Sequence, residues 1–350
     1  MSASELKGKV VTVLGPVDSH VLGITLPHEH FFYDTRSRFV EPTDDQGKTY
    51  AYQPVTLDNV GWVTKNWINS RDNLVIEDEA VAINEAKLFK DIGGGTIVDV
   101  TNVGQPRNPD GLCRIARATG LDIVMGAGYY FGYFHPQGMD QRTEDDIAQE
   151  IVADLTVGVS DTGIKAGLIG EVGFSTPFDP NELKSLRASV AAQQECGVAL
   201  SIHPGHVPES PFQIIDMLEE AGADLSRVVM GHIERSSLDM DGILQVASRG
   251  CYVEFDWFGT LTPAYPYGPV DVPSDSVRIK QIRTLIREGY LNQILVSHDV
   301  CFKMRLACYG GPGYAHISKY VVHWMEEMGI IPGEIEVLTK TNPQKMLAIV

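Results

Sequence analysis

Histidine and carboxylate residues, the side chains that most often bind divalent metals, recur at the ends of short apolar segments. The first such segment ends in Pro27-His28-Glu29-His30. In a β-strand the side chains of residues i and i+2 point to the same face, so His28 and His30 can hold one ion while Glu29 points away. The pair alone is a weak signal, because two buried histidines can equally be satisfied by hydrogen bonds.

The same pattern returns on later segments. Ligand-type residues end the segments LIGEVG, SIHPG, MGHIE and VSHD, namely Glu171, His203, His232, His298 and Asp299. So many coincidences favour a metal site over isolated buried polar residues. We expect two ions joined by one carboxylate, with these ligands: His28, His30 and Asp299 for one ion, His203 and His232 for the other, and Glu171 as the bridge.

This set of ligands predicts the chemistry of hydrolysis. Imidazole and carboxylate ligands without thiolate favour Zn²⁺, and Mn²⁺, Co²⁺ or Fe²⁺ are also compatible. Two ions about 3.5 to 4 Å apart can share a water, lower its pKa toward neutrality and supply hydroxide to an electrophile whose oxygen one metal polarises. Asp299 is then expected to accept the proton of that water and deliver it to the leaving group.

The elements that must position these residues alternate between short apolar runs and longer segments with helical spacing. Strands are predicted over 24–30, 95–100, 122–130, 166–173, 198–205, 227–234, 251–256 and 293–299. Helices are predicted over 77–92, 108–119, 143–158, 180–196, 211–222, 238–249, 276–289, 315–329 and 333–348. This alternation favours a closed (β/α)₈ TIM barrel over a doubly wound open sheet, with the polar strand ends forming the site.

Two stretches lie outside the repeat and are expected at the mouth of the barrel, where loops build sites. Residues 31–75 form a long insertion after the first strand, and residues 257–275 form a loop rich in Pro, Tyr and Gly after the seventh. Neither has the composition of a linker. Residues 1–350 are therefore interpreted as a single barrel domain with long mouth loops and a C-terminal helix.

Composition limits the partners. The 350 residues include 46 acidic and 28 basic side chains, a net charge of −18 that argues against nucleic acid or an anionic membrane surface. The five cysteines form no CxxC pair and fit packed thiols in a reducing compartment. No apolar run approaches the roughly 20 residues that span a bilayer. We expect a cytoplasmic enzyme with a small-molecule substrate, and a homodimer is possible.

The order of the motifs resembles the phosphotriesterase family of the amidohydrolase superfamily: HEH, an acid on the fourth strand, HPG, GHIER and SHD. The longer strings HPGHVPESPFQIIDMLEEAGAD, GCYVEFDWFGT and KMRLACYGGPGYAHI are similar to the phosphotriesterase-related, or resiniferatoxin-binding, branch. The best-known family members bridge their metals with a carbamylated lysine, whereas Glu171 stands at this place here. Lys165 lies near the start of the strand and is expected to face the other end of the barrel.

The resemblance implies hydrolysis of a small ester, lactone, phosphorylated sugar lactone, organophosphate triester or N-acyl amide such as N-acetyltaurine. Arg235, Lys303 and Arg305 follow expected ligands and could pair with a sulfonate, phosphate or carboxylate, or form surface ion pairs. Tyr130 could bind a substrate carbonyl, and Tyr314 in GGPGYAH could shape the mouth or bind substrate. We expect an anionic ester, lactone or amide as substrate. The alternatives are an organophosphate triesterase and a ligand-binding protein without turnover.

Overall fold

Eight parallel strands form one curved sheet in the computed structural model, which describes residues 6–236, 238–260, 265–267 and 271–350. Along the sheet they follow chain order: β3 (Ile24–Glu29), β6 (Gly94–Asp99), β7 (Asp122–Ala127), β8 (Leu168–Gly173), β9 (Leu200–His203), β10 (Val228–Met230), β11 (Tyr252–Phe255) and β12 (Ile294–Val296). Hydrogen bonds from the Asp299 amide and the Ser297 hydroxyl to the His28 carbonyl join the last strand to the first. The predicted TIM barrel and all eight predicted strands are confirmed.

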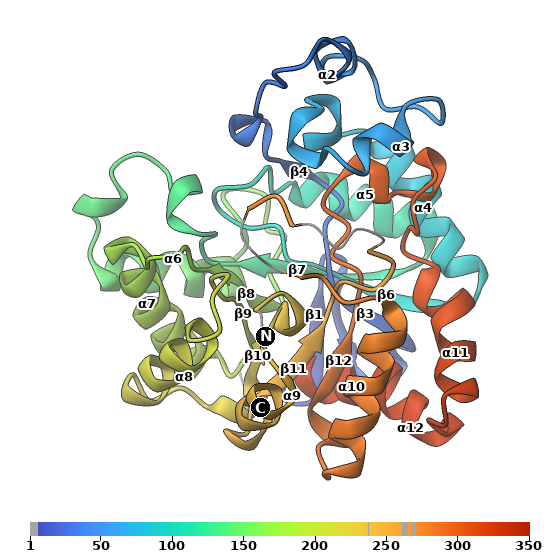
Figure 1. Cartoon of the computed structure of the whole chain (residues 1–350). Helices are drawn as coiled ribbons and strands as arrows, with labels where there is room; N and C mark the ends of the chain where they lie inside the picture. The colour runs from blue at the N-terminus through green and yellow to red at the C-terminus, as the bar shows by residue number, and fades with distance from the viewer. Residues whose placement is uncertain (1–5, 237, 261–264, 268–270) are drawn as a thin grey trace.

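Helices alternate with the strands and cover the outside of the sheet (Figure 1). They are α4 (Glu79–Asp91), α5 (Pro109–Thr119), α6 (Glu144–Thr156), α7 (Pro180–Cys196), α8 (Ser210–Glu220), α9 (Met240–Ser248) and α10 (Asp275–Arg287). Helix α7 shows the local sequence signals from which the helix ends could be predicted. It begins with a capping box between Asp179 and Glu182 and ends at Gly197, whose φ of 66° is left-handed.

The C-terminal part of the chain contains two π-helical turns that the sequence did not predict. The predicted helix 315–329 consists of a π turn over Ile317–Val321 and α11 (Val322–Glu327). The predicted C-terminal helix 333–348 consists of α12 (Pro332–Glu336), a π turn over Val337–Thr341 and α13 (Asn342–Leu347). A π turn shifts the hydrogen bonding by one residue without a change in residue type that would reveal it.

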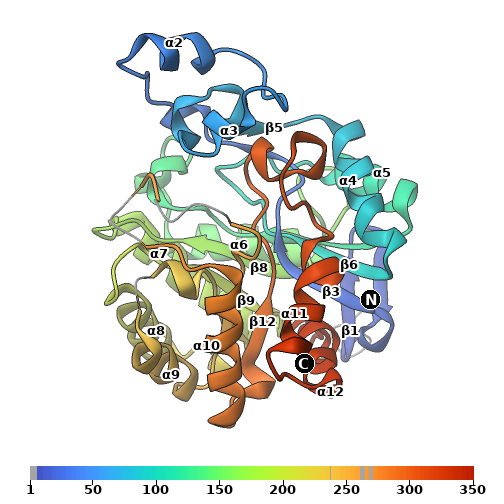
Figure 2. The same ribbon diagram turned by 45° about the vertical axis from the view of Figure 1, so that its right-hand side comes forward.

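The insertion between β3 and α4 forms a cap over one end of the barrel (Figures 1 and 2). It contains β4 (Tyr33–Asp34), α2 (Asp45–Ala51), α3 (Val60–Val63) and β5 (Val75–Ile76), and a 3-10 turn over Arg36–Arg38 follows β4. The hairpin of β1 (Lys9–Thr12) and β2 (Gly15–Asp18) lies at the other end, where the amide of Val13 donates to the carbonyl of Ile123 near the start of β7. The cap therefore stands at the mouth, as predicted.

Apolar side chains inside the barrel support the polar strand ends from below. A buried set that includes Val124, Ala199 and Leu295 fills the interior, separate from the larger core under the helices. Along β9 the interior face runs from Ala199, just before the strand, to His203, because every second residue of a strand points the same way. Buried apolar side chains thus lie beneath the site residues. No helix among the described residues has the length and apolar character to cross a membrane.

Candidate metal centre

The six side chains predicted as metal ligands meet at the C-terminal ends of the strands, where all are buried. They are His28, His30, Glu171, His203, His232 and Asp299. Glu171 lies at the centre: its Oε2 atom is 2.7 Å from Nδ1 of His203 and 3.2 Å from Nε2 of His232. The same oxygen is 3.4 Å from Nε2 of His28, and Oε1 is 3.4 Å from Nε2 of His30. One carboxylate therefore faces both groups of histidines, as a bridging ligand must.

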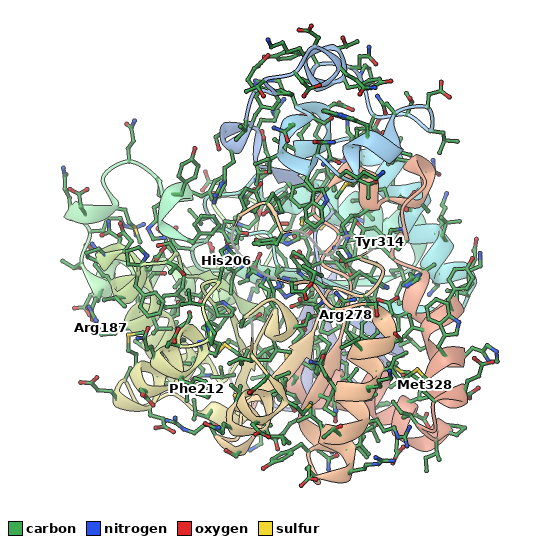
Figure 3. The ribbon with its side chains drawn as sticks, in the orientation of Figure 1. Arg187, His206, Phe212, Arg278, Tyr314 and Met328 are labelled. Atoms are coloured by element: carbon green, nitrogen blue, oxygen red, sulfur yellow. The ribbon has the colours of Figure 1, made fainter. Side chains whose placement is uncertain are left out.

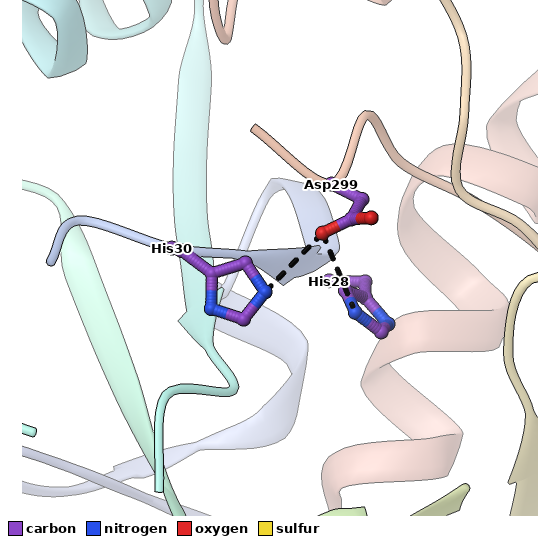
Figure 4. Close-up of side chains that lie close together, drawn as sticks. All are labelled: His28, His30 and Asp299. Carbon is purple, nitrogen blue, oxygen red and sulfur yellow. Dashed lines mark ion pairs between the residues drawn. The ribbon is translucent and has the colours of Figure 1, made fainter. Parts of the chain in front are cut away.

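Asp299 completes the cluster beside the two histidines of β3 (Figure 4). Its Oδ1 atom is 3.2 Å from Nε2 of His30 and 4.0 Å from Nε2 of His28. Nε2 of His28 is buried and has no hydrogen-bond partner among the described residues. Buried polar atoms normally have one, so this lone pair is best explained by a cation that it would bind. The cluster could hold metal, because the ligand atoms of His28, His30 and Asp299 lie within 4.8 Å of one another.

Two of these cluster residues have an uncommon backbone conformation. His232 and Asp299 have φ angles of 51° and 52°, in the left-handed region that side chains with a Cβ rarely adopt. The amide of His232 donates to Oδ2 of Asp256 at 2.8 Å, and the amide of Asp299 donates to the carbonyl of His28 at 3.2 Å. Such backbone strain concentrates at functional sites, where surrounding contacts maintain it.

Glu254 and Asp256, at the end of β11, contact the ring nitrogens of His28 and His232 that face away from Glu171. Neither acid was predicted from the sequence. Oε2 of Glu254 is 3.0 Å from Nδ1 of His28, and Oδ1 of Asp256 is 2.8 Å from Nδ1 of His232. A carboxylate on one ring nitrogen directs the other toward a metal. Their i, i+2 spacing at a strand end is the same signal that identified His28 and His30, so the alternation could have found them.

Glu29 points away from the cluster, as predicted, and organises the loop after β12. Its carboxylate accepts hydrogen bonds from Nδ1 of His298 at 2.7 Å and from the amides of His298 and Val300 at 3.0 Å. Nε2 of His298 in turn accepts from the amide of Ile317 at 3.1 Å. Of the two ligand-type residues in VSHD, only Asp299 therefore reaches the cluster.

The buried charges strongly shift one another's pKa values. Burial opposes protonation of His30, but hydrogen bonds to Asp299 and Glu171 raise its pKa to about 9. Burial also opposes ionisation of Glu171, yet the neighbouring histidines, His203 foremost, hold its pKa well below the usual range. Burial and the Arg235 guanidinium lower the pKa of His203 to about 3. Glu171 is therefore charged, the state in which a carboxylate can bind a metal, whereas His30 would have to release its proton to bind one.

A narrow cavity of about 40 Å³ opens beside the cluster. Its wall includes Asp299 and His203 from the cluster, the side chains of Arg38 and Arg235, and aromatic rings from the cap and from the loops after β7, β11 and β12. A mostly aromatic wall with a few polar groups is typical of a small-molecule site. The cavity thus leads to the cluster at His203 and Asp299.

Two of the five residues predicted to contact substrate, Arg235 and Tyr130, line this cavity. Arg235 is only 2% exposed, and its Nη1 donates to Nδ1 of His206 at 2.8 Å and to the hydroxyl of Tyr265 at 2.9 Å. Its Nη2 donates to Nε2 of His203 at 3.0 Å. The ring of Tyr130 packs edge-on against His203, with the ring centroids 5.1 Å apart. Both side chains thus touch a cluster residue from the substrate side.

Arg305 and Lys303 do not line the cavity, and the structure does not support the prediction that they contact substrate. Nη2 of Arg305 donates to the carbonyls of Phe258 at 3.1 Å and His298 at 2.6 Å. Nζ of Lys303 donates to Oδ1 of Asp72 in the cap at 2.6 Å. The first side chain joins the loops after β11 and β12, and the second ties the cap to the barrel.

Tyr314 also lies outside the cavity lining and supports the site from behind. Its hydroxyl donates to the carbonyl of His30 at 2.6 Å, and its ring packs edge-on against Phe31. Of its two predicted roles, the structure therefore favours shaping the mouth. Figure 3 shows Tyr314 and His206 on the side of the barrel nearest the cap. Lys165 lies at the opposite end beside the β1–β2 hairpin, as predicted.

Several further cavity residues had not been assigned to the site, among them Trp257 and Arg38. Trp257, the first residue of the predicted loop 257–275, donates from Nε1 to Oδ2 of Asp299 at 3.0 Å. It directly follows the strand-end acids of β11, so its position offered a signal. Arg38 lies in the cap, where no periodic pattern relates the sequence to the barrel. Part of the predicted loop 257–275, residues 261–264 and 268–270, lies outside the described residues.

Fold and cluster together define a TIM-barrel enzyme with a cluster of histidine and carboxylate side chains at its mouth. The model of the phosphotriesterase family matches residues 8–347. The chain is 39% identical to the N-acetyltaurine hydrolase of Dictyostelium discoideum, over 99% of this chain and 100% of the relative. It is 40% identical to the N-acetyltaurine hydrolase of Xenopus tropicalis, over 98% and 99%. A resiniferatoxin-binding protein from Rhodobacter sphaeroides superimposes with a TM-score of 0.94 at 37% identity, over 97% and 95%.

The chain therefore belongs to the phosphotriesterase family, and it is a hydrolase. The resemblance that the motifs carried is confirmed, including the related branch, because these relatives match nearly the whole chain. Phosphotriesterase-family enzymes depend on metal, and the histidine and carboxylate cluster is the part of this structure that could bind it.

Proposed function

We propose that this hydrolase uses two divalent metal ions to cleave the amide bond of a small anionic N-acyl amine, with N-acetyltaurine as the first substrate to test. One observation carries the proposal: His203 and Asp299 of the cluster line the same cavity as two arginine side chains, Arg38 and Arg235. The relatives named N-acetyltaurine hydrolase match this chain over almost their entire length, which supports an amide over an ester or lactone.

The number and type of ligands support two ions. A zinc ion takes about four ligands, so six exceed the need of one. The proposed ligand sets are His28, His30 and Asp299 for one ion and His203 and His232 for the other, with Glu171 shared between them. Zn²⁺ suits this set, and Mn²⁺, Co²⁺ or Fe²⁺ also fit. Ions bound there would acidify water and polarise a carbonyl oxygen.

Asp299 is the group placed to move a proton. Its carboxylate lines the cavity, with Trp257 donating to Oδ2 and His30 beside Oδ1. Burial opposes ionisation, but the hydrogen bond from His30 and the charge of His232 lower the pKa of Asp299 below its usual range. It therefore begins as a proton acceptor. An amine leaves only after it gains a proton, and Asp299 can return the proton that it accepted.

Arg235 provides positive charge for an anionic substrate. Its guanidinium is buried, and the acceptors that it contacts, His203, His206 and Tyr265, are neutral groups. A buried cation without an opposite charge is costly, and a bound anion would offset that cost. A neutral imidazole has one proton. If His203 gives the lone pair of Nδ1 to a metal, Nε2 carries that proton and stops accepting from Arg235. Nη2 of Arg235 is then available to substrate.

The test combines metal analysis with a hydrolysis panel on the purified protein. The panel contains N-acetyltaurine, a neutral lactone and a phosphotriester, each assayed with and without chelator. We expect close to two metal ions per chain and chelator-sensitive release of taurine and acetate. Preferred turnover of the lactone or the phosphotriester would overturn the amide assignment. A folded protein that binds these compounds without metal or turnover would instead be a binding protein.

A further inference from the structure

We propose that Arg38, in the cap, binds the terminal oxyanion of the substrate and selects sulfonate or carboxylate substrates over neutral ones. This inference rests on the proposed function and extends it, because it adds a recognition group from the insertion to Arg235 of the barrel. Three observations support it: the position of Arg38, the lack of an acidic partner, and the donors beside it.

Arg38 is placed on the wall of the cavity. It is the last residue of the 3-10 turn after β4, and it lines the cavity together with Asp299 and Arg235. It also lines an adjoining hollow with His203 and His206. Arg235 contacts His203 directly, whereas Arg38 projects from the cap. A substrate held at the cluster can therefore reach both guanidinium groups, with Arg38 at its outer end.

Aromatic rings hold the Arg38 guanidinium without neutralising it. Its carbon lies 4.2 Å from the ring centroid of Tyr267, 5.4 Å from that of Tyr133 and 5.7 Å from that of Phe131. Such stacking uses the face of the guanidinium and leaves the N–H edges free to donate. Within the described part of the chain Arg38 forms no ion pair. Arg36, two residues earlier, instead forms an ion pair with Asp34, with Nη2 2.6 Å from Oδ2.

Tyr267 adds a free donor beside Arg38. Its hydroxyl is buried without a hydrogen-bond partner among the described residues, although a buried hydroxyl is costly to leave unpaired. Its ring also packs on Tyr265, with centroids 5.5 Å apart, and the hydroxyl of Tyr265 accepts from Arg235. This wall thus offers N–H and O–H donors and positive charge. Asp299, a proposed metal ligand, is the sole carboxylate among the described residues lining the cavity. Oxyanions fit such a set best.

The experiment measures a selectivity ratio, the kcat/KM for N-acetyltaurine divided by that for the neutral N-acetylpropylamine. N-acetyl-β-alanine is assayed as the substrate that carries a carboxylate instead of a sulfonate. The variants are Arg38→Met, Arg38→Lys and the matched control Arg36→Met, whose arginine lies on the same turn but outside the cavity lining. Circular dichroism and thermal unfolding check that each variant is folded.

We expect Arg38→Met to lower the ratio about 10- to 100-fold, mainly through a higher KM, because a charge-assisted hydrogen bond is lost. Arg38→Lys should keep more of the ratio than Arg38→Met, since lysine keeps the positive charge but cannot donate two parallel hydrogen bonds to an oxyanion. Arg36→Met should keep the ratio within about twofold, as expected for a surface ion pair. A ratio in Arg38→Met within twofold of the parent value would overturn the proposal.

A binding measurement separates this proposal from the proposed function. If the protein cleaves none of these amides, the proposed function fails, and calorimetric titration with ethanesulfonate then tests the subsite alone. Binding that weakens about tenfold or more in Arg38→Met but not in Arg36→Met would support the subsite. No binding to the parent protein, or equal binding to all variants, would overturn it.

Discussion

Replacing Asp256 by Asn tests whether one carboxylate orients ligands of both proposed metal ions. Oδ1 of Asp256 is 2.8 Å from Nδ1 of His232, and Oδ2 accepts the backbone amide of His232, also at 2.8 Å. Oδ2 lies 3.4 Å from Nδ1 of His28 as well. An amide has only one oxygen, so either placement of Asn puts its NH₂ group against a donor of His232. The substitution keeps the volume and breaks the hydrogen bonding.

The magnitude follows from these contacts. Losing a hydrogen bond to a charged group costs about 1.5 to 3 kcal/mol. Loss of such a support typically weakens metal affinity about 10- to 100-fold. Because Asp256 faces histidines from both proposed ligand sets, we expect both ions to bind more weakly. Glu254→Gln provides the matched comparison. Its Oε2 contacts His28 alone among the ligands, at 3.0 Å, so only one ion should be affected.

The assay is a competition titration of metal-depleted protein with Zn²⁺ against a chelator of known affinity, followed by elemental analysis. The parent should give two Kd values, both raised in Asp256→Asn and one raised in Glu254→Gln. Thermal unfolding without metal checks that each variant keeps its fold. Unchanged Kd values in Asp256→Asn, or identical effects of the two variants, would refute the reasoning that Asp256 serves both ions.

Three further predictions follow. Asp299→Asn should retain much of the metal and lower kcat about 10²- to 10⁴-fold, measured on N-acetyltaurine beside metal content, and retained activity would remove Asp299 from proton transfer. Arg235→Ala should raise KM for an anionic substrate more than it lowers kcat, and a loss confined to kcat would contradict its role in binding. Burial opposes ionisation of Asp275, yet the hydrogen bond from His316 and the charge of Arg278 hold its pKa below the usual value. Its stabilising effect is therefore present above about pH 4 and lost as the pH falls through the lower folded-state pKa, so urea unfolding should show the parent and Asp275→Asn converging in acid.

The barrel could be predicted because its strands are buried on both faces. Segments such as 95–100 and 293–299 read as nearly continuous apolar runs, and helix ends such as Gly197 carry local signals. These patterns depend on residues close together in the chain. The π turns over Ile317–Val321 and Val337–Thr341 were missed because they change hydrogen bonding and not residue type.

The cluster could be predicted because strand ends of a barrel converge on one mouth. Lys303 and Arg305, although close to Asp299 in sequence, do not line the cavity, however. Asp299 has a left-handed φ of 52°, and the chain beyond it carries Lys303 to Asp72 in the cap. Arg38 reaches the cavity from the cap. The cap lies outside the alternation of strands and helices, so its sequence does not indicate which of its residues face the barrel.

The sequence by itself determined the barrel, the family and the residues that form the cluster, because apolar periodicity and the order of motifs can be read along the chain. The tertiary structure decided which charges face the cavity. Arg235 and Arg38 line it, while the equally basic Arg305 is buried against the carbonyls of Phe258 and His298. The physical reason is that a loop residue takes its position from contacts with distant segments, and those contacts exist only after the chain has folded.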